Sequence, residues 1–270
     1  AMTGSQIGVL TSAQVGALSS AQITALTATQ LPSFSLDGLQ SITPAGLSAL
    51  STAKIAALSD VQFGNLTTSQ LNQLTTAQVQ SLATSSKLSS ITATQMAALN
   101  SAQLVALTSD QVSSLKTAQL ASLSTAQIAV IETDDLVGLS TAQILSLTSA
   151  QVAALTTGQI ASMGTDQVAS FSATQIPSLM TKHVVALSNE QVAALTKTQL
   201  AAMTTAQMLS MEIADVPYIA VGQISGLTTA QLAAMSTSQT AAFTDDQLAA
   251  MSAKLRKSRW KRVMMRGFMD

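Results

Sequence analysis

The chain has 270 residues, no cysteine and a formal net charge of −1; 47% of its residues are hydrophobic, 9% are charged and 3% are aromatic. The absence of cysteine excludes disulfides and thiolate metal sites. Ser, Thr and Gln recur so often that no stretch approaches the roughly 18 uninterrupted apolar residues that a membrane-spanning helix needs. We therefore expect that the repetitive part of the chain does not cross a bilayer.

An eight-residue phrase repeats along almost the whole chain, from Leu10 to Ala250. We number each octad from its large apolar residue, so that Leu10 is position 1, and the register then holds to Met251 with one nine-residue interruption at 82–90. A unit this short cannot bury an apolar face alone, so each octad must be completed by its neighbours. The sequence predicts one octapeptide-repeat solenoid at residues 1–252, followed by a basic amphipathic helix or cap at 253–270.

Position 2 of the octad is nearly always Ser or Thr and position 5 is nearly always Gln, as in Thr11 and Gln14. This spacing is typical of the capping box at a helix N-terminus. Pro44 falls at position 3, the first helical residue, where its missing N–H costs nothing. The acidic residues of the repeats all fall in positions 2 to 5, near the positive end of a helix dipole. The pattern predicts a helix capped at position 2, with Ser, Thr and Gln facing solvent.

Three prolines, Pro32, Pro177 and Pro217, fall at position 7, where the helix should already be ending. A continuous helix is excluded because an octad rotates by about 80° when each residue turns by about 100°. We therefore predict an all-α solenoid of very short capped helices, one per octad, with positions 1 and 6 buried and small residues at 7 and 8. A β-solenoid is the alternative, although Ala, Gln, Leu and Met favour helix.

No residue pattern indicates chemistry. His183, the only histidine, stands at position 5 as a polar replacement for Gln, and Asp135 and Asp215 have the same explanation. The densest acidic cluster, formed by Glu132, Asp134 and Asp135, matches no calcium-binding spacing. The serines have no base beside them, and there is no phosphate-binding loop or zinc motif. We expect no enzyme activity and no catalytic, cofactor-binding or metal site.

The C-terminal segment 254–270 departs from the octad pattern, and seven of the chain's 12 Lys and Arg residues lie in it. We expect contacts with an anionic partner at Lys254, Arg256, Lys257, Arg259, Trp260, Lys261, Arg262 and Arg266. Three interpretations remain open: a cap over the last repeat, a binder of anionic lipid or nucleic acid, or a segment without a role.

From Met2 to Met251 the chain resembles the octapeptide-repeat segments of large bacterial surface or exported proteins, in which Leu-Thr-Thr-Ala-Gln-Val-type units recur. The resemblance implies an extended scaffold at or outside the cell surface and no activity, although no signal peptide is visible at the N-terminus. The phrase from Leu187 to Leu195 is also similar to the opening helix of the repeats in transcription-activator-like DNA-binding effectors. Those repeats carry a base-reading loop that the octads lack, so we do not transfer DNA reading.

Together these patterns predict a non-enzymatic structural or interaction scaffold that binds proteins or further copies of itself through a repetitive Ser, Thr and Gln surface. Many weak identical contacts would add through avidity. One alternative is an anionic membrane or nucleic-acid binder acting through residues 254–270. Another is an ice or crystal-surface binder that uses regularly spaced Thr hydroxyls. No small-molecule substrate is expected.

Overall fold

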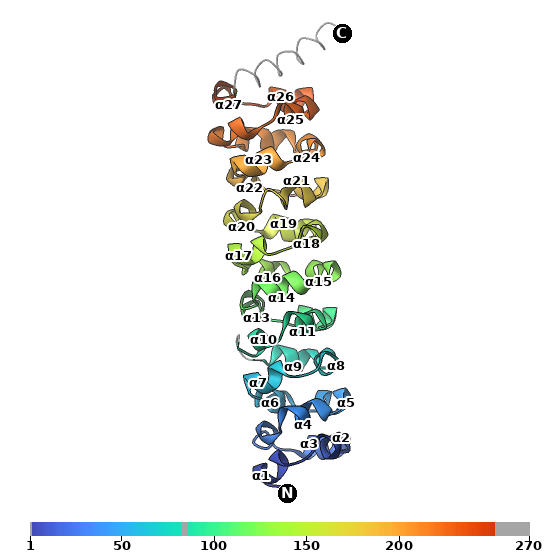
Figure 1. Cartoon of the computed structure of the whole chain (residues 1–270). Coiled ribbons are helices and arrows are strands. Elements are labelled where there is room, and N and C mark those ends of the chain that lie inside the picture. Colours follow the sequence, from blue (N-terminus) through green and yellow to red (C-terminus); the bar gives the residue numbers. More distant parts are fainter. Residues whose placement is uncertain (1, 83–85, 252–270) are drawn as a thin grey trace. The chain divides into compact units, whose positions relative to one another are not determined.

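The computed structural model describes residues 2–82 and 86–251, and within these residues every regular element is a short helix, with no β-strand. The chain divides into two compact units between Leu139 and Ser140. Figure 1 shows the short helices of each unit following one another along the chain. The predicted all-α solenoid with about one helix per octad is confirmed, and the β-solenoid alternative is wrong.

In the first unit the helices are α1 Gly4–Gly8, α2 Ser12–Gly16, α3 Ser20–Ala25, η1 Leu31–Ser33, α4 Leu36–Ser41, α5 Pro44–Ser48, α6 Thr52–Ala56, α7 Asp60–Gly64, α8 Thr68–Asn72, α9 Thr76–Gln80, α10 Ser86–Ser90, α11 Ala93–Ala97, α12 Ser101–Val105, α13 Ser109–Ser113, α14 Thr117–Ser122, α15 Thr125–Ala129 and α16 Thr133–Val137.

In the second unit they are α17 Thr141–Leu145, α18 Ser149–Ala154, α19 Thr157–Ser162, α20 Thr165–Ser170, η2 Ile176–Ser178, α21 Thr181–Val185, α22 Asn189–Ala194, α23 Lys197–Ala202, α24 Thr205–Ser210, η3 Ile213–Tyr218, η4 Val221–Gly226, α25 Thr229–Ala234, α26 Thr237–Ala241 and α27 Asp245–Ala250. The η elements are 3₁₀ helices.

Most of the α-helices begin at the predicted capping box; α4, α5, α6 and α16 are among those that do not. In α2 the Thr11 hydroxyl accepts a hydrogen bond from the Gln14 backbone N–H at 3.3 Å, and Gln14 Oε1 accepts one from the Thr11 N–H at 2.9 Å. These bonds satisfy two of the N–H groups that a helix start otherwise leaves without partners. Helices of five or six residues are not stable alone in water, so the caps and the packing of neighbouring octads must stabilise them together.

The described corners between octads use right-handed helical or extended backbone, always with negative φ. At the end of α14, Leu123 has φ −65° and ψ 141°, and the next residue, Ser124, which caps α15, has φ −68° and ψ 162°. Any L-residue adopts these angles, so the corner has no need for glycine. This explains why Leu, Ser and Thr fill the corners of nearly every octad.

The three octads with proline at position 7 form 3₁₀ helices, as does the octad of η4, which has no proline. Pro32 lies in η1, Pro177 in η2 and Pro217 in η3. Proline has no N–H to donate to the carbonyl four residues earlier, so the α-helical pattern cannot extend through position 7. The prediction that the helix is already ending at position 7 is wrong: η1, η2 and η3 run through the proline to position 8, so the proline changes the type of helix and does not end it.

The core is a line of large apolar side chains from positions 6 and 1. Leu58 and Phe63, at positions 1 and 6 of one octad, are each 1% exposed, as is Leu66 at the start of the next octad, and Ile55 at position 6 of the octad before is fully buried. The predicted inward positions are therefore confirmed. Small residues at positions 7 and 8 let successive turns approach: a Cβ on Gly64 would lie 2.8 Å from the Ser90 carbonyl oxygen.

Within each unit, helices three octads apart pack together. In the first unit α5 contacts α8, α11 contacts α14 and α13 contacts α16; in the second unit α21 contacts α24. The chain therefore coils so that every octad meets the one that lies three places further along. This coiling brings side chains about 30 residues apart into contact.

Candidate interaction surface

The Gln at position 5 joins successive turns of the coil. Gln70 caps its own helix through Oε1, which accepts from the Thr67 N–H at 2.9 Å. Its Nε2 points the opposite way and donates to the Leu39 carbonyl at 2.9 Å and to the Ile42 carbonyl at 2.8 Å. The side chain is 1% exposed. One carboxamide thus satisfies a helix start and two corner carbonyls of the preceding turn.

The same donor arrangement recurs in both units, and we call it the glutamine ladder. In the first unit the donors are Gln62, Gln70, Gln78, Gln95, Gln103, Gln111, Gln119 and Gln127. In the second unit they are Gln175, Gln191, Gln199, Gln207, Gln231, Gln239 and Gln247. The expectation that Gln faces solvent is therefore wrong at these positions, because the coiling buries position 5 against the preceding turn.

The ladder fixes how many octads make one turn of the coil. Gln191 donates to Ile160, 31 residues earlier, and to Met163, 28 residues earlier. Ile160 is position 6 of the octad four places back, and Met163 opens the octad three places back. Each Gln therefore lies over the junction between two earlier octads, and a turn contains between three and four octads.

The nine-residue interruption at 82–90 changes the spacing of the ladder without breaking it. Gln103 donates to Leu71 and Leu74, 32 and 29 residues earlier. Gln119 donates to Leu88 and Ile91, again 31 and 28 residues earlier. The carboxamides on the C-terminal side of the interruption therefore still reach equivalent carbonyls.

Where position 5 is not Gln, the replacement shows what the ladder requires. Lys54 donates through Nζ to the Thr24 carbonyl at 2.6 Å, 30 residues earlier. It keeps the donor between turns but cannot accept the cap hydrogen bond, and Ser51 at the start of α6 has no side-chain cap. Donation to the preceding turn and capping of the helix are thus separate roles, which Gln combines.

His183 takes the place of Gln as predicted. Its Nδ1 accepts from the Met180 N–H at 3.1 Å, which completes the cap of α21, and the ring is fully buried. Nε2 is buried without completing a hydrogen bond. Burial lowers the pKa of His183, the positive charge of Lys182 lowers it further, and the Leu155 carbonyl opposes both effects. The ring is therefore held neutral, with Nδ1 as the acceptor.

The two aspartates at position 5 are also buried, each 4% exposed. Asp135 accepts from the Ser109 hydroxyl at 2.6 Å, whereas Oδ2 of Asp215 is buried with no hydrogen-bond partner. Burial raises the pKa of Asp215, and the charge of Glu212 raises it further, against the Glu212 backbone hydrogen bond. A carboxylate has no N–H to donate to the preceding turn, so these positions are the weak points of the ladder.

The acidic cluster at the start of α16 does not gather its carboxylates at one point. Asp135 faces inward, while Glu132 and Asp134 are exposed. In residues 2–82 and 86–251, no three His, Asp or Glu side chains lie close enough together to hold a metal ion.

The solvent-facing surface consists of positions 2 to 4 and part of position 7. In the octad of α17, Ser140, Thr141 and Ala142 are exposed, and Leu145 at position 7 is about half exposed, at 51%. The outward face is therefore a repeat of hydroxyls and small apolar side chains. Gln contributes little to it beyond the first turn.

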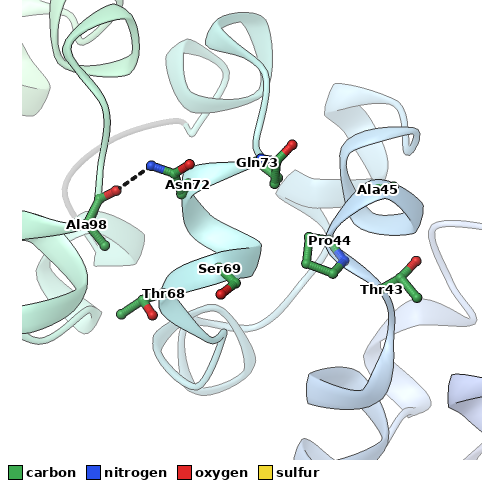
Figure 2. A pocket seen from close by; sticks show the side chains of 8 residues that line it. All are labelled: Thr43, Pro44, Ala45, Thr68, Ser69, Asn72, Gln73 and Ala98. Atoms are coloured by element: carbon green, nitrogen blue, oxygen red, sulfur yellow. Dashed lines mark hydrogen bonds between the residues drawn. The ribbon is translucent and has the colours of Figure 1, made fainter.

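One groove lies on this face of the first unit, between α5, α8 and the end of α11. Figure 2 shows its lining residues, among them Pro44, Ser69 and Asn72, and the hydrogen bond that Asn72 Nδ2 donates to the Ala98 carbonyl at 2.8 Å. Its volume is about 600 Å³ and it opens widely to solvent. Its lining contains no charged residue, so it is an uncharged contact surface with no group for acid–base chemistry.

Two further sequence predictions concern membrane-spanning helices and the basic C-terminal segment. No helix in the described part of the chain is long and apolar enough to cross a membrane. The basic contacts expected at Lys254 to Arg266 lie outside the described residues.

The comparisons with known proteins point to a repeat and to nothing more specific. Residues 128–165 and 217–253 match the family model described as the ALTTAQ repeat. No curated protein matches the sequence. The two matched segments are thus similar to a short-repeat family, in agreement with an octapeptide-type repeat.

Proposed function

We propose that the protein is a non-enzymatic scaffold that makes weak, repeated contacts with proteins, further copies of the chain included, through its outward hydroxyl surface. The observation that supports this most is the contrast in burial within the octad. The position-5 Gln is buried and hydrogen-bonded in the ladder, whereas positions 2 to 4 are exposed in most octads. The resemblance to segments of bacterial surface or exported proteins supports a site of action at or outside the cell surface.

A surface of this kind binds tightly only when many of its weak contacts form at the same time. Each octad offers a few hydroxyls and methyl groups, and a single weak contact would dissociate quickly. When many contacts form together, each further contact becomes intramolecular, and the overall affinity rises by orders of magnitude. A scaffold built from near-identical octads is suited to this mode.

The proposal is tested with the full chain displayed densely on beads and the same chain offered in solution, either singly or as a tetramer. We expect the tetramer to be retained far better than the single chain. Thr→Glu substitutions at the exposed first helical residues Thr141, Thr157, Thr165 and Thr205 should lower retention in steps as their number rises. Acidic residues are favourable in a first helical turn, so these variants should remain folded.

The step-wise loss separates avidity from a single binding site. If one of these substitutions removes all retention, the surface contains a discrete site and the proposal fails. The proposal also fails if beads that display the chain retain the wild-type tetramer no better than albumin-coated beads do.

A second function, binding to anionic membranes or nucleic acid, is favoured by the segregation of charge towards residues 254–270. Its test replaces the seven Lys and Arg of that segment by Gln in the full chain. Retention on phosphatidylserine vesicles and on duplex DNA is then measured at several salt concentrations. Salt-sensitive binding that the replacement removes supports this function, and binding that it leaves unchanged excludes it.

A further inference from the structure

Asp215 stands in the glutamine ladder of the second unit at a place where a donor is needed. The ladder residues on either side, Gln207 and Gln231, donate through Nε2 to the carbonyls 31 and 28 residues earlier. Counted in the same register, Asp215 lies over the carbonyls of Val184 and Leu187. Its helix, η3, packs against α22, which begins two residues after Leu187. Asp215 is therefore placed opposite a pair of corner carbonyls.

This carbonyl pair lacks the partner that its counterpart one octad earlier has. The Leu179 carbonyl receives Nε2 of Gln207 at 2.6 Å. Leu187 is buried, and among the described residues its carbonyl accepts no hydrogen bond. A buried main-chain carbonyl without a partner is rare in folded proteins. Where Gln would bring a donor to this point, Asp215 brings a further oxygen.

The carboxylate of Asp215 lacks a partner in the same place. One of its oxygens accepts from the Glu212 N–H, while Oδ2 is buried and accepts no hydrogen bond. In the first unit the Ser109 hydroxyl, 26 residues earlier, donates to the equivalent Asp135. The residue 26 places before Asp215 is Asn189, and Oδ2 accepts nothing from it. Buried charges in proteins are paired or bound to a metal ion, so this arrangement of oxygens calls for a cation.

The space between these oxygens fits a small ion. The Asp side chain is one carbon–carbon bond shorter than Gln, so Oδ2 stops short of the point that a ladder nitrogen reaches by up to about 1.5 Å. The nitrogens of Gln207 and Gln231 lie 2.6 to 2.7 Å from their carbonyl oxygens. Two oxygens bound at right angles to one cation, at the bond lengths that Ca²⁺ takes, are about 3.3–3.7 Å apart. Na⁺ has nearly the same radius as Ca²⁺.

The charge of the site favours the monovalent ion of this size. Asp215 is the only buried carboxylate among residues 140–251, and Glu212 is exposed. Na⁺ balances this single charge, whereas a divalent ion would leave a positive charge buried. Ca²⁺ also takes six to eight oxygens, and Mg²⁺ keeps several waters, for which a side chain that is 4% exposed leaves little access.

We propose that the Asp215 carboxylate and the main-chain carbonyls of Val184 and Leu187 form a binding site for a sodium ion. The ion takes the place of the Nε2 hydrogens of Gln and joins two turns of the second unit. In sodium-free solution the oxygens face one another without a partner, which costs stability that sodium restores. Two of the three ligands are main-chain oxygens, so no side-chain motif in the sequence indicates the site. The inference goes beyond the proposed function and does not depend on it.

The test measures the thermal midpoint of the full chain at pH 8 while sodium chloride replaces tetramethylammonium chloride at constant ionic strength. Both salts screen surface charges equally, but tetramethylammonium is too large for the site. We expect sodium to raise the wild-type midpoint by about 2–4 °C. Asp215→Asn keeps the shape of the side chain and removes its charge, and it should lose most of this rise. The sodium resonance in nuclear magnetic resonance should broaden with the wild type and much less with Asp215→Asn.

The matched control is Asp135→Asn, which makes the same change at the buried aspartate that Ser109 already satisfies, and it should keep the full response to sodium. Asp215→Gln supplies a second variant, because it restores the ladder donor and should also be insensitive to sodium. The inference is overturned if the wild type gains no more from sodium than from tetramethylammonium, or if both Asp215 variants respond as the wild type does. It is overturned as well if calcium chloride produces the same Asp215-dependent rise at a much lower concentration than sodium chloride.

Discussion

The side-chain amide of Gln70 donates to the main-chain carbonyl of Leu39, 31 residues earlier in the chain, over 2.9 Å. The same side chain caps the helix that it belongs to. Local structure and coiling therefore depend on opposite ends of one carboxamide. Each octad needs both the helix cap and the hydrogen bonds between turns. Its own helix is too short to be stable alone, and its corner carbonyls are buried against the next turn.

Replacing Gln70 by Glu should destabilise the protein although the two side chains have the same shape. Glutamate still accepts the Thr67 N–H, but it cannot donate to Leu39 or Ile42, and it buries a charge beside their carbonyls. Leaving a buried polar group without its partner costs about 1–3 kcal/mol, and more when a charge is buried. Urea unfolding followed by circular dichroism measures the change.

The exposed Gln73 provides the control for this loss, since Gln73→Glu introduces the same charge on the same helix without touching the ladder. Its unfolding midpoint should stay within about 0.5 kcal/mol of the wild type. Equal effects of the two variants would mean that the Gln70 bonds between turns contribute nothing to stability.

His183→Gln should stabilise the protein, and more so at acidic pH. The pKa of His183 lies below its usual value of 6.5 in the folded state, so between that lowered pKa and 6.5 the unfolded chain binds more protons. The wild type therefore loses stability as the pH falls through this window, and the Gln variant does not. The difference between their thermal midpoints should grow from pH 7.5 to pH 5; a constant difference would contradict the buried neutral ring.

Asp215→Gln should stabilise the protein with the opposite pH dependence. Asp215 has a pKa above its usual 3.8 in the folded state, so the folded chain holds a proton that the unfolded chain releases, and wild-type stability falls as the pH rises through the raised pKa. Gln restores the missing donor and removes the buried charge, a gain of about 1–3 kcal/mol near neutral pH. Urea midpoints at pH 7 and pH 4 should show the larger gain at pH 7.

Gly64→Ala should destabilise the first unit by about 1–3 kcal/mol, because the new Cβ would lie 2.8 Å from the Ser90 carbonyl oxygen and force two turns apart. Gly158→Ala is the matched change on an open surface, where the nearest atom lies at 3.9 Å. Alanine favours helix there, so that variant should gain about 0.5–1 kcal/mol. Thermal unfolding distinguishes the two, and a tolerated Gly64→Ala would mean that the turns pack less closely than a 2.8 Å approach implies.

The sequence allowed the octad itself to be predicted well, because every signal involved was local. The spacing of Thr11 and Gln14 indicated the capping box, and Pro44 marked the first helical residue. The large apolar positions 1 and 6 indicated the core for the same reason. These features depend on at most one and a half turns of helix, which the phrase of eight residues contains in full. The prolines at position 7 predicted the helix end wrongly, because a 3₁₀ helix continues through each of them.

The burial of Gln was missed because it depends on where the preceding turn lies, about 30 residues away. A capping box needs only an oxygen, and Glu supplies one as well as Gln does. The sequence nevertheless never places Glu at position 5, and at Lys54 it keeps a donor while giving up the acceptor. Although Asp135 and Asp215 lack an N–H donor, the predominance of Gln at position 5 was the available signal that this position faces a row of carbonyls.

Hydrogen exchange of the glutamine side-chain amides, followed by nuclear magnetic resonance on the full chain at low concentration, tests the ladder most directly. The Nε2 hydrogens of ladder residues such as Gln70 and Gln191 should exchange far more slowly than those of Gln14, Gln22 and Gln73. Uniformly fast exchange at all of these side chains would show that position 5 faces water, and the coil of three to four octads per turn would then be wrong.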